Sequence, residues 1–293
     1  MKDLHKVQEA DIKNLFANIE SHDENNAKEA DLRMKNLRKM QESDIEKIVA
    51  IIESHDEDDA EEAESGYRKM GGIDNNYVYE VNGETIGITG FSIPAGCEQT
   101  YWLSWTYIDD KHTNKGHGRS MLGEIIAYIK RSGGRKLFVK VSDYVDPEDG
   151  AIYAAALHLY QSLGFEIEVT HKDFYDKDES QIILGMRLKD KEVVDVEDDN
   201  CNVQFDGIFE IAETENVYSF NWHDEGKYPL KAKDVQIGIN AVRDDDARAI
   251  FLSFPSNLTQ IEAPLLQSGF IKTGILEDYY DDGIDENHYS IYR

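Results

Sequence analysis

Residues 101–108 are mostly aromatic or β-branched, a composition typical of a buried strand. A polar stretch with Gly116 and Gly118 follows, and apolar residues then recur at helical spacing over residues 121–129 until the glycines at 133–134. The pattern predicts a strand, a glycine turn and a helix in succession. Such a turn gathers unpaired amides and the positive end of a helix dipole, so this spot suits a phosphate group.

Strand-like patterns lie on both sides of this unit. Asn82 and Gly83 separate two runs of alternating apolar and polar residues, which is a strong signal for a hairpin. A short first strand is expected before it, near residues 36–41. Downstream we expect a strand at residues 136–141, a helix that closes on Gly164 and Phe165, and two closing strands at residues 166–169 and 181–188.

This order of elements, with Tyr160-Gln161-Ser162-Leu163-Gly164-Phe165 ending the second helix, resembles the GNAT acetyltransferase superfamily over about residues 35–190. The resemblance implies an α/β (α+β) fold with a mixed, mostly antiparallel central sheet flanked by helices. In this family a motif of Arg or Gln, two residues, Gly, one residue and then Gly or Ala wraps the pyrophosphate of acetyl-coenzyme A. Both glycines are present here, but Thr113 stands where Arg or Gln is usual.

The resemblance also implies roles for individual residues. Acetyl-coenzyme A, as cosubstrate, would contact the backbone of Ile108 and the turn formed by Lys115, Gly116, His117, Gly118, Arg119 and Ser120. Tyr160 falls at the position of the tyrosine that protonates the departing thiolate in many members, while Tyr153 replaces a frequent Asn. A purely structural alternative for Tyr160 is an aromatic side chain that packs its helix onto the sheet.

The sequence offers several candidates for the catalytic base. An alkylamine has a pKa near about 10 and is mostly protonated at pH 7, so a base has to remove one proton, directly or through a water. The strand segment 102–107 carries no carboxylate. Glu98, Asp109, Asp143 and Glu80 therefore stay open as bases that act through a water, and we favour Glu98.

The chain contains an internal repeat. Residues 6–12 and 17–24 recur 33 positions later, as residues 39–45 and 50–57. Each copy ends a helical pattern with His-Asp-Glu, where solvated charge is the usual outcome, so we expect no metal site there.

The C-terminal hundred residues follow a charged linker at 189–200 and show strand and helix patterns without a Gly-x-Gly turn. We therefore expect residues 1–34 with 191–293 to form a second, smaller, degenerate GNAT-like domain beside the active domain at 35–190. Residues 277–282 would then be candidates to wall the acceptor site. The alternative is that residues 1–34 are an appended helix.

Acidic residues outnumber basic residues by 59 to 31, which gives a formal net charge of -28. This charge disfavours nucleic acid and anionic membranes and attracts cationic substrates, unless it serves only solubility. The two cysteines, Cys97 and Cys201, lack metal-site spacing, no apolar run reaches about 20 residues, and the first residues do not resemble a secretory signal. We expect a reduced, cytoplasmic protein that binds neither nucleic acid nor membrane.

Together these features predict an N-acetyltransferase that moves the acetyl group of acetyl-coenzyme A directly to a primary amine of a small molecule. Acetylation of a protein N-terminus or lysine is the near alternative. A non-catalytic protein that binds coenzyme A or a partner is the alternative from another class, favoured by Thr113 and the missing strand carboxylate. A purely interactive acidic protein, such as a nucleic-acid mimic, would leave the glycine turn unexplained. The sequence gives no indication of the oligomeric state.

Overall fold

The computed structural model describes residues 34–293 except residue 98 and residues 147–149 and 243–245. The described chain forms two compact units, and each is described by itself. Unit 1 holds residues 34–92 and 104–134, and unit 2 holds residues 93–103 and 135–293. The first copy of the N-terminal repeat lies outside the described residues.

Unit 1 contains an antiparallel sheet centred on β2 and β3. β2 pairs with β1 on one edge and β3 on the other, and β5 pairs with β3. At the turn between β2 and β3, Asn82 has φ 54° and Gly83 has φ 82°, left-handed values that a tight two-residue hairpin requires. The predicted hairpin is therefore confirmed. The strands are β1 (Leu37–Lys39), β2 (Asn76–Val81), β3 (Glu84–Ser92) and β5 (Tyr107–Ile108).

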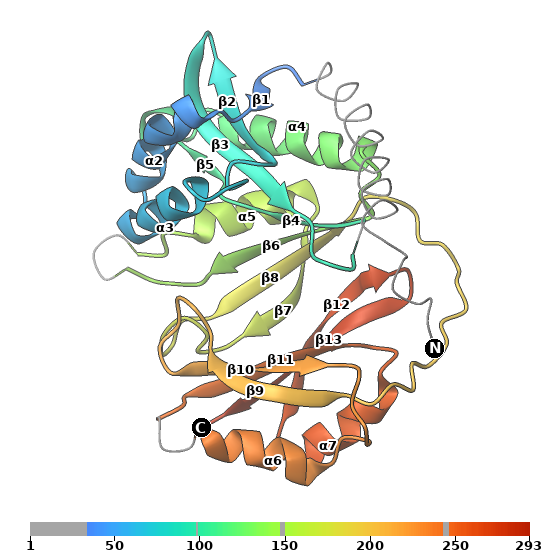
Figure 1. Cartoon of the computed structure of the whole chain (residues 1–293). Coiled ribbons are helices and arrows are strands. Elements are labelled where there is room, and N and C mark those ends of the chain that lie inside the picture. The colour runs from blue at the N-terminus through green and yellow to red at the C-terminus, as the bar shows by residue number, and fades with distance from the viewer. Residues whose placement is uncertain (1–33, 98, 147–149, 243–245) are drawn as a thin grey trace, which may run out of the picture. The chain divides into compact units, whose positions relative to one another are not determined.

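Helices cover both faces of this sheet (Figure 1). Ile48 of the second helix packs with Val78 in one cluster, whereas Tyr128 of the fourth helix packs against Tyr77 and Phe91. The side chains of neighbouring strand residues point to opposite faces of the sheet. The second helix therefore covers the face of Val78, and the fourth helix covers the face of Tyr77. The helices of unit 1 are η1 (Glu42–Asp44), α2 (Ile45–Glu53), α3 (Glu57–Tyr67), η2 (Asp110–His112) and α4 (His117–Arg131).

The strand predicted at residues 101–108 is interrupted. Its first part is β4 (Thr100–Leu103), which pairs in parallel with β6 (Lys136–Ser142), and its last part is β5, which pairs with β3. Between the two parts the Thr106 hydroxyl donates to the Ser104 carbonyl at 2.9 Å. The prediction of one continuous strand is wrong, because residues 104–106 between the two parts are not part of a strand.

Unit 2 contains a long mixed sheet in the order β4-β6-β8-β7-β12-β13-β11-β10-β9. Its further strands are β7 (Glu166–His171), β8 (Gln181–Arg187), β9 (Gln204–Glu210), β10 (Val217–His223), β11 (Ala249–Pro255), β12 (Ile271–Asp281) and β13 (Ile284–Tyr292). Its helices are α5 (Ala154–Leu163), α6 (Ala232–Ala241), η3 (Thr259–Ile261) and α7 (Glu262–Gln267). None of the helices in the described ranges is long and apolar enough to cross a bilayer. The predicted fold, a mixed and mostly antiparallel sheet flanked by helices, is confirmed.

The strands of unit 2 follow one pattern twice. β4 is parallel to β6, β6 is antiparallel to β8, and β8 is antiparallel to β7. In the same way β10 is parallel to β11, β11 is antiparallel to β13, and β13 is antiparallel to β12. Gly274 of β12 pairs with Val169 of β7 where the two patterns meet, so one sheet runs across the predicted boundary at residue 190. The division into domains 35–190 and 1–34 with 191–293 stays a prediction.

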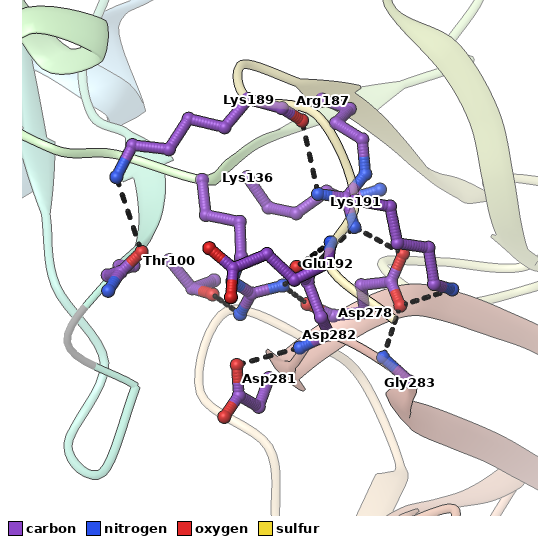
Figure 2. Close-up of polar contacts among 12 residues, drawn as sticks. Thr100, Lys136, Arg187, Lys189, Lys191, Glu192, Asp278, Asp281, Asp282 and Gly283 are labelled. Carbon is purple, nitrogen blue, oxygen red and sulfur yellow. Dashed lines mark hydrogen bonds and ion pairs between the residues drawn. The ribbon is translucent and has the colours of Figure 1, made fainter. Parts of the chain in front are cut away.

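Buried charges fasten the turn between β12 and β13 within unit 2 (Figure 2). Asp278 and Asp282 are only 3% and 4% exposed. Arg187 donates to Asp278 Oδ2 at 2.8 Å and to Asp282 Oδ1 at 2.6 Å, and Lys191 Nζ lies 2.7 Å from Asp278 Oδ1. Arg135 lies 3.4 Å from Asp282 Oδ1 and also donates to the Asp278 carbonyl. We call these five residues the charge clasp.

The charge clasp lowers the pKa of its carboxyl groups. Burial alone would raise the pKa of Asp278, but hydrogen bonds from Lys191, the Gly283 amide and Arg187 lower it to about 2. The pKa of Asp282 is also lowered, since Arg187 and the Glu192 amide outweigh its burial. Buried charges are tolerated when they are paired in this way.

The charge clasp makes the stability of unit 2 depend on pH. An unfolded Asp has a pKa of about 3.9, so the stabilisation from Asp278 is complete above that value and disappears as the pH falls toward 2. Denaturant unfolding at several pH values should therefore give a steeper loss of free energy between pH 5 and 2 in the wild type than in Asp278→Asn. The difference approaches one proton, about 1.4 kcal/mol per pH unit. Equal slopes would contradict an ionised Asp278 in the folded state.

Candidate functional site

Ile108 presents its backbone groups away from β3. It lies opposite Gly87, and the adjacent Asp109 amide donates to the Ile86 carbonyl at 2.8 Å. In an antiparallel pair, bonded and non-bonded positions alternate, so the Ile108 amide and carbonyl point outward from this ladder. This is the geometry that a ligand lying along the strand requires.

The Ile108 carbonyl accepts a hydrogen bond from His55, a contact that the sequence did not predict. His55 Nε2 lies 2.7 Å from the Ile108 oxygen and therefore carries the proton that it donates. The His55 ring also lies 5.5 Å from the Tyr107 ring. His55 belongs to the second His-Asp-Glu triplet, which thus has a role in packing on β5. Sequence spacing could not indicate this contact, because 53 residues separate His55 from Ile108.

The glycine turn has the backbone that the sequence predicts. Asn114 has φ 57° and Gly116 has φ 83°, both left-handed. The Ser120 amide donates to the Gly116 carbonyl at 3.1 Å, so Gly116 is the N-cap of α4. A Cβ added at Gly116 would have no atom within 4 Å, and the first turn of α4 contains no acidic residue. Open space, helix N-terminal amides and the absence of negative charge fit a phosphate group.

The side chains of this turn divide into packed and exposed ones. The His117 ring lies 6.2 Å from Tyr79 and 6.4 Å from His112, so it packs on the sheet. Lys115 and Arg119 are exposed, and Lys115 Nζ donates to the Lys111 carbonyl at 2.5 Å. The His117 ring is therefore engaged in packing, and its amide belongs to the first turn of α4.

The predicted cofactor-contacting residues lie together in unit 1. A Cβ at Gly87 would approach Ile108 Cδ1 to 2.6 Å and the Met121 sulfur to 3.2 Å, so Ile108 and the start of α4 meet over this glycine. The structure thereby brings Ile108 close to the turn of residues 115–120. Gly87 itself has no room for a side chain, which the sequence analysis did not recognise.

Tyr160 lies in unit 2, near the C-terminal end of α5. Gly164 ends this helix with φ 102°, and the Phe165 amide donates to the Tyr160 carbonyl at 3.1 Å. The Tyr160 ring meets Phe165 edge to face at 5.6 Å, and the residue is 6% exposed. These contacts agree with the structural alternative for Tyr160 and leave its catalytic role a prediction.

Structural partners occupy the candidate bases that the structure describes. Glu80 accepts from Arg38 at 2.9 Å, and Asp143 accepts from the Ser180 amide at 2.6 Å. Asp109 accepts from the Lys111 amide at 3.1 Å and pairs with Lys47 at 3.4 Å. Burial alone would raise the pKa of Asp109, but these two partners lower it below its usual value. Glu98, the favoured candidate, lies outside the described residues.

The described residues also show whether a metal could bind, whether the cysteines are free, and where the two tryptophans pack. No group of three or more His, Cys, Asp or Glu residues in the described ranges could hold a metal ion. Cys97 and Cys201 are both free thiols. Trp102 and Trp105 differ in their surroundings, since Trp102 packs on Phe138 in unit 2 and Trp105 packs against the α2 and α3 cluster of unit 1.

Comparison with known proteins identifies the central part of the chain. Residues 73–167 match the sequence model of the acetyltransferase (GNAT) domain family. This range includes β3, β5, the glycine turn, α4 and α5. This region of the chain is therefore similar to the acetyltransferase domains that the GNAT family model describes. A comparison with curated proteins finds no match to the chain.

Several solved structures match about half of the chain. A putative GNAT acetyltransferase from Desulfovibrio desulfuricans is 22% identical, with a TM-score of 0.45 over 52% of this chain and 98% of that chain. A putative acetyltransferase from Salmonella typhimurium, solved with its cofactor acetyl-CoA, is 19% identical, with a TM-score of 0.43 over 55% and 97%. An aminoglycoside 6'-N-acetyltransferase complexed with coenzyme A is 10% identical, with a TM-score of 0.43 over 54% and 100%.

Two glycines of α4 give a matched test of the turn. Gly116→Ala forces a side chain into a left-handed backbone and should cost about 1–2 kcal/mol. Gly123→Ala, in the same helix and also with open space around it, should instead stabilise the protein by about 0.5–1 kcal/mol. Urea unfolding of both variants measures the contrast, and a stabilising Gly116→Ala would contradict the left-handed turn.

Proposed function

We propose that this protein transfers the acetyl group of acetyl-coenzyme A to the primary amine of a small molecule. The observation that carries the proposal is the left-handed turn at Gly116 within the GNAT domain. That turn opens a 15-residue helix beside a strand whose Ile108 backbone points outward. Backbone amides of residues 115–120 would hold the pyrophosphate, and Lys115 and Arg119 would add positive charge. Ile108 would contact the pantetheine arm through its amide, because His55 already binds its carbonyl.

The reaction requires two proton transfers. The amine gives up one proton before its nitrogen attacks the thioester carbon, the carbon–sulfur bond then breaks, and the sulfur leaves as a thiolate that takes up a proton. We propose Tyr160 as the donor to the sulfur and Glu98 as the base, acting through a water. Asp109, Asp143 and Glu80 are weaker candidates, since each already accepts a hydrogen bond from a structural partner.

Two observations favour a small cationic acceptor in the cytoplasm. The net charge of -28 attracts a protonated amine from solution and slows the approach of nucleic acid or anionic membranes. Both cysteines are free, as is usual in a reducing compartment. Acetylation of a protein N-terminus or lysine is the alternative for the acceptor.

A non-catalytic coenzyme-binding protein is the alternative from another class. The burial of Tyr160 and the structural partners of three candidate bases favour it. It predicts that acetyl-coenzyme A binds without release of the thiol in the presence of any amine.

Tyr160→Phe tests the proposed reaction. The variant keeps the ring that packs on Phe165 and removes only the hydroxyl, so α5 should keep its packing and the KM for acetyl-coenzyme A should stay unchanged. The kcat for thiol release with a panel of small primary amines should fall about 100-fold, the usual contribution of a general acid. An unchanged kcat would show that Tyr160 only packs α5. Coenzyme binding without any turnover in the wild type would favour the non-catalytic alternative.

A further inference from the structure

Unit 1 contains a cavity of about 250 Å³ at the C-terminal end of α3. The cavity extends from α3 to the beginning of β2 and to the residues that link β4 with β5. Pockets for drug-sized ligands usually measure about 300–1,000 Å³, so this one suits a smaller molecule. The lining residues that matter below are Gly66, Tyr67, Asp74, Asn76, Ser104 and Trp105.

The cavity lies further along the same strand edge as Ile108. Ile108 is opposite Gly87 on β3, whereas the Ser104 amide donates to the Gly90 carbonyl at 3.0 Å. His117, at the start of α4, packs on Tyr79, which pairs with Gly87. The glycine turn therefore lies level with Ile108, and Ser104 lies about 10 Å further along β3, at about 3.3 Å per residue from Gly87 to Gly90. A pantetheine arm that starts at the glycine turn and passes Ile108 along this strand edge would extend toward the cavity.

Two polar groups of the cavity, the Tyr67 hydroxyl and the Asp74 carboxylate, are available to bind a ligand. The Asn76 side chain is fixed, because it donates to the carbonyls of Gly72 and Asp74 and accepts from the Ser104 hydroxyl at 3.2 Å. The Tyr67 hydroxyl is buried and has no hydrogen-bond partner among the described residues. The Asp74 carboxylate is exposed and forms no ion pair with any residue of the described ranges.

The charge around the cavity is negative. Asp74 is its lining carboxylate, and no Lys or Arg lines it. Helix α3, with the sequence EDDAEEAESGY, carries six acidic residues, of which Glu64 pairs with Arg68 after the helix. Tyr67 and Trp105 supply aromatic surface next to this negative charge. A low-dielectric cavity beside carboxylates concentrates small cations that carry an apolar body.

We propose that this cavity binds the acceptor, a primary ammonium on a short aromatic or aliphatic stem. The inference rests on the proposed function for its chemistry and on the cavity for its selectivity. Asp74 attracts the ammonium group, Tyr67 and Trp105 enclose the stem, and the Tyr67 hydroxyl finds its partner on the ligand. The cavity, at about 250 Å³, has room for a small amine of this kind.

A pair of glycine variants distinguishes an effect at this cavity from a general effect of adding a leucine to a helix. Gly66 lies in α3 and lines the cavity, and a Cβ added there meets no atom within 4 Å. Gly66→Leu therefore adds apolar volume at the wall of the cavity, and its Cβ causes no clash. Gly123→Leu is the matched control, because Gly123 also lies in a helix with open space around it and does not line the cavity.

The first measurement is thiol release from acetyl-coenzyme A with 2-phenylethylamine as the probe. Gly66→Leu should raise the KM for the amine at least about tenfold and leave the stabilisation by acetyl-coenzyme A unchanged, while Gly123→Leu behaves as wild type. Asp74→Asn should raise the same KM several-fold, with a smaller effect at high salt. Turnover in Gly66→Leu with a KM within twofold of wild type would place the acceptor elsewhere and overturn the inference. So would turnover with a peptide amine but not with 2-phenylethylamine.

A second measurement tests amine binding in the cavity independently of acetyl transfer. Ligand-observed NMR of 2-phenylethylamine with the coenzyme-free full chain should show binding in the wild type and Gly123→Leu, and none in Gly66→Leu. If acetyl-coenzyme A does not bind the wild type, the proposed function fails, yet this pattern would still support an amine site in the cavity. Equal amine binding by all three proteins, or none by the wild type, would overturn the cavity as an amine site.

Discussion

The register of β5 on β3 is the constraint on which the candidate site depends. Ile108 lies opposite Gly87, and the next residue, Asp109, donates its amide to the Ile86 carbonyl. As a result Ile108 keeps its amide and carbonyl directed away from β3. His55 binds the carbonyl, which fixes the end of β5 against α2.

The left-handed backbone at Gly116 depends on this arrangement and completes it. A turn of this kind lets α4 begin close to β5, so the amides of its first turn lie near Ile108. An L-residue with a side chain would be strained at this position. One strand position and one glycine thus bring a ligand-facing backbone and a phosphate-binding helix terminus into the same part of unit 1.

Unit 2 is stabilised by a different kind of interaction. Its strands show one pairing pattern twice, and the two patterns meet where β7 pairs with β12. The charge clasp brings together side chains from the residue before β6, the end of β8, the following linker, β12 and the β12–β13 turn (Figure 2). Buried carboxylates are costly unless they are paired, so removing one member should cost more than breaking a surface ion pair. The clasp gives Asp278 and Asp282 a structural role in unit 2, and the expectation that residues 277–282 wall the acceptor site stays a prediction.

The parts of the fold that follow local rules could be predicted from the sequence. The hairpin at Asn82 and Gly83, the glycine turn before α4, and the end of α5 at Gly164 each depend on backbone geometry that a few neighbouring residues determine. The break between β4 and β5 could not be predicted, because residues 101–108 are nearly all aromatic or β-branched and no turn residue marks the interruption. The same holds for the His55 contact, the charge clasp and the cavity at Tyr67, where residues far apart in sequence meet. For Tyr160 the helix position follows from the sequence, and the residue lies near the end of α5 as expected. Its packing on Phe165 does not determine whether its hydroxyl acts as an acid.

The most direct test of the account is calorimetric titration of acetyl-coenzyme A into the full chain and into Gly118→Trp. Gly118 belongs to the first turn of α4, so a tryptophan there should block the phosphate site, whereas Gly123→Trp further along the helix should not. The account predicts binding by the wild type and Gly123→Trp and loss of binding by Gly118→Trp. Absence of binding in the wild type at saturating coenzyme, or equal binding by all three proteins, would contradict the assignment of this turn as the coenzyme site.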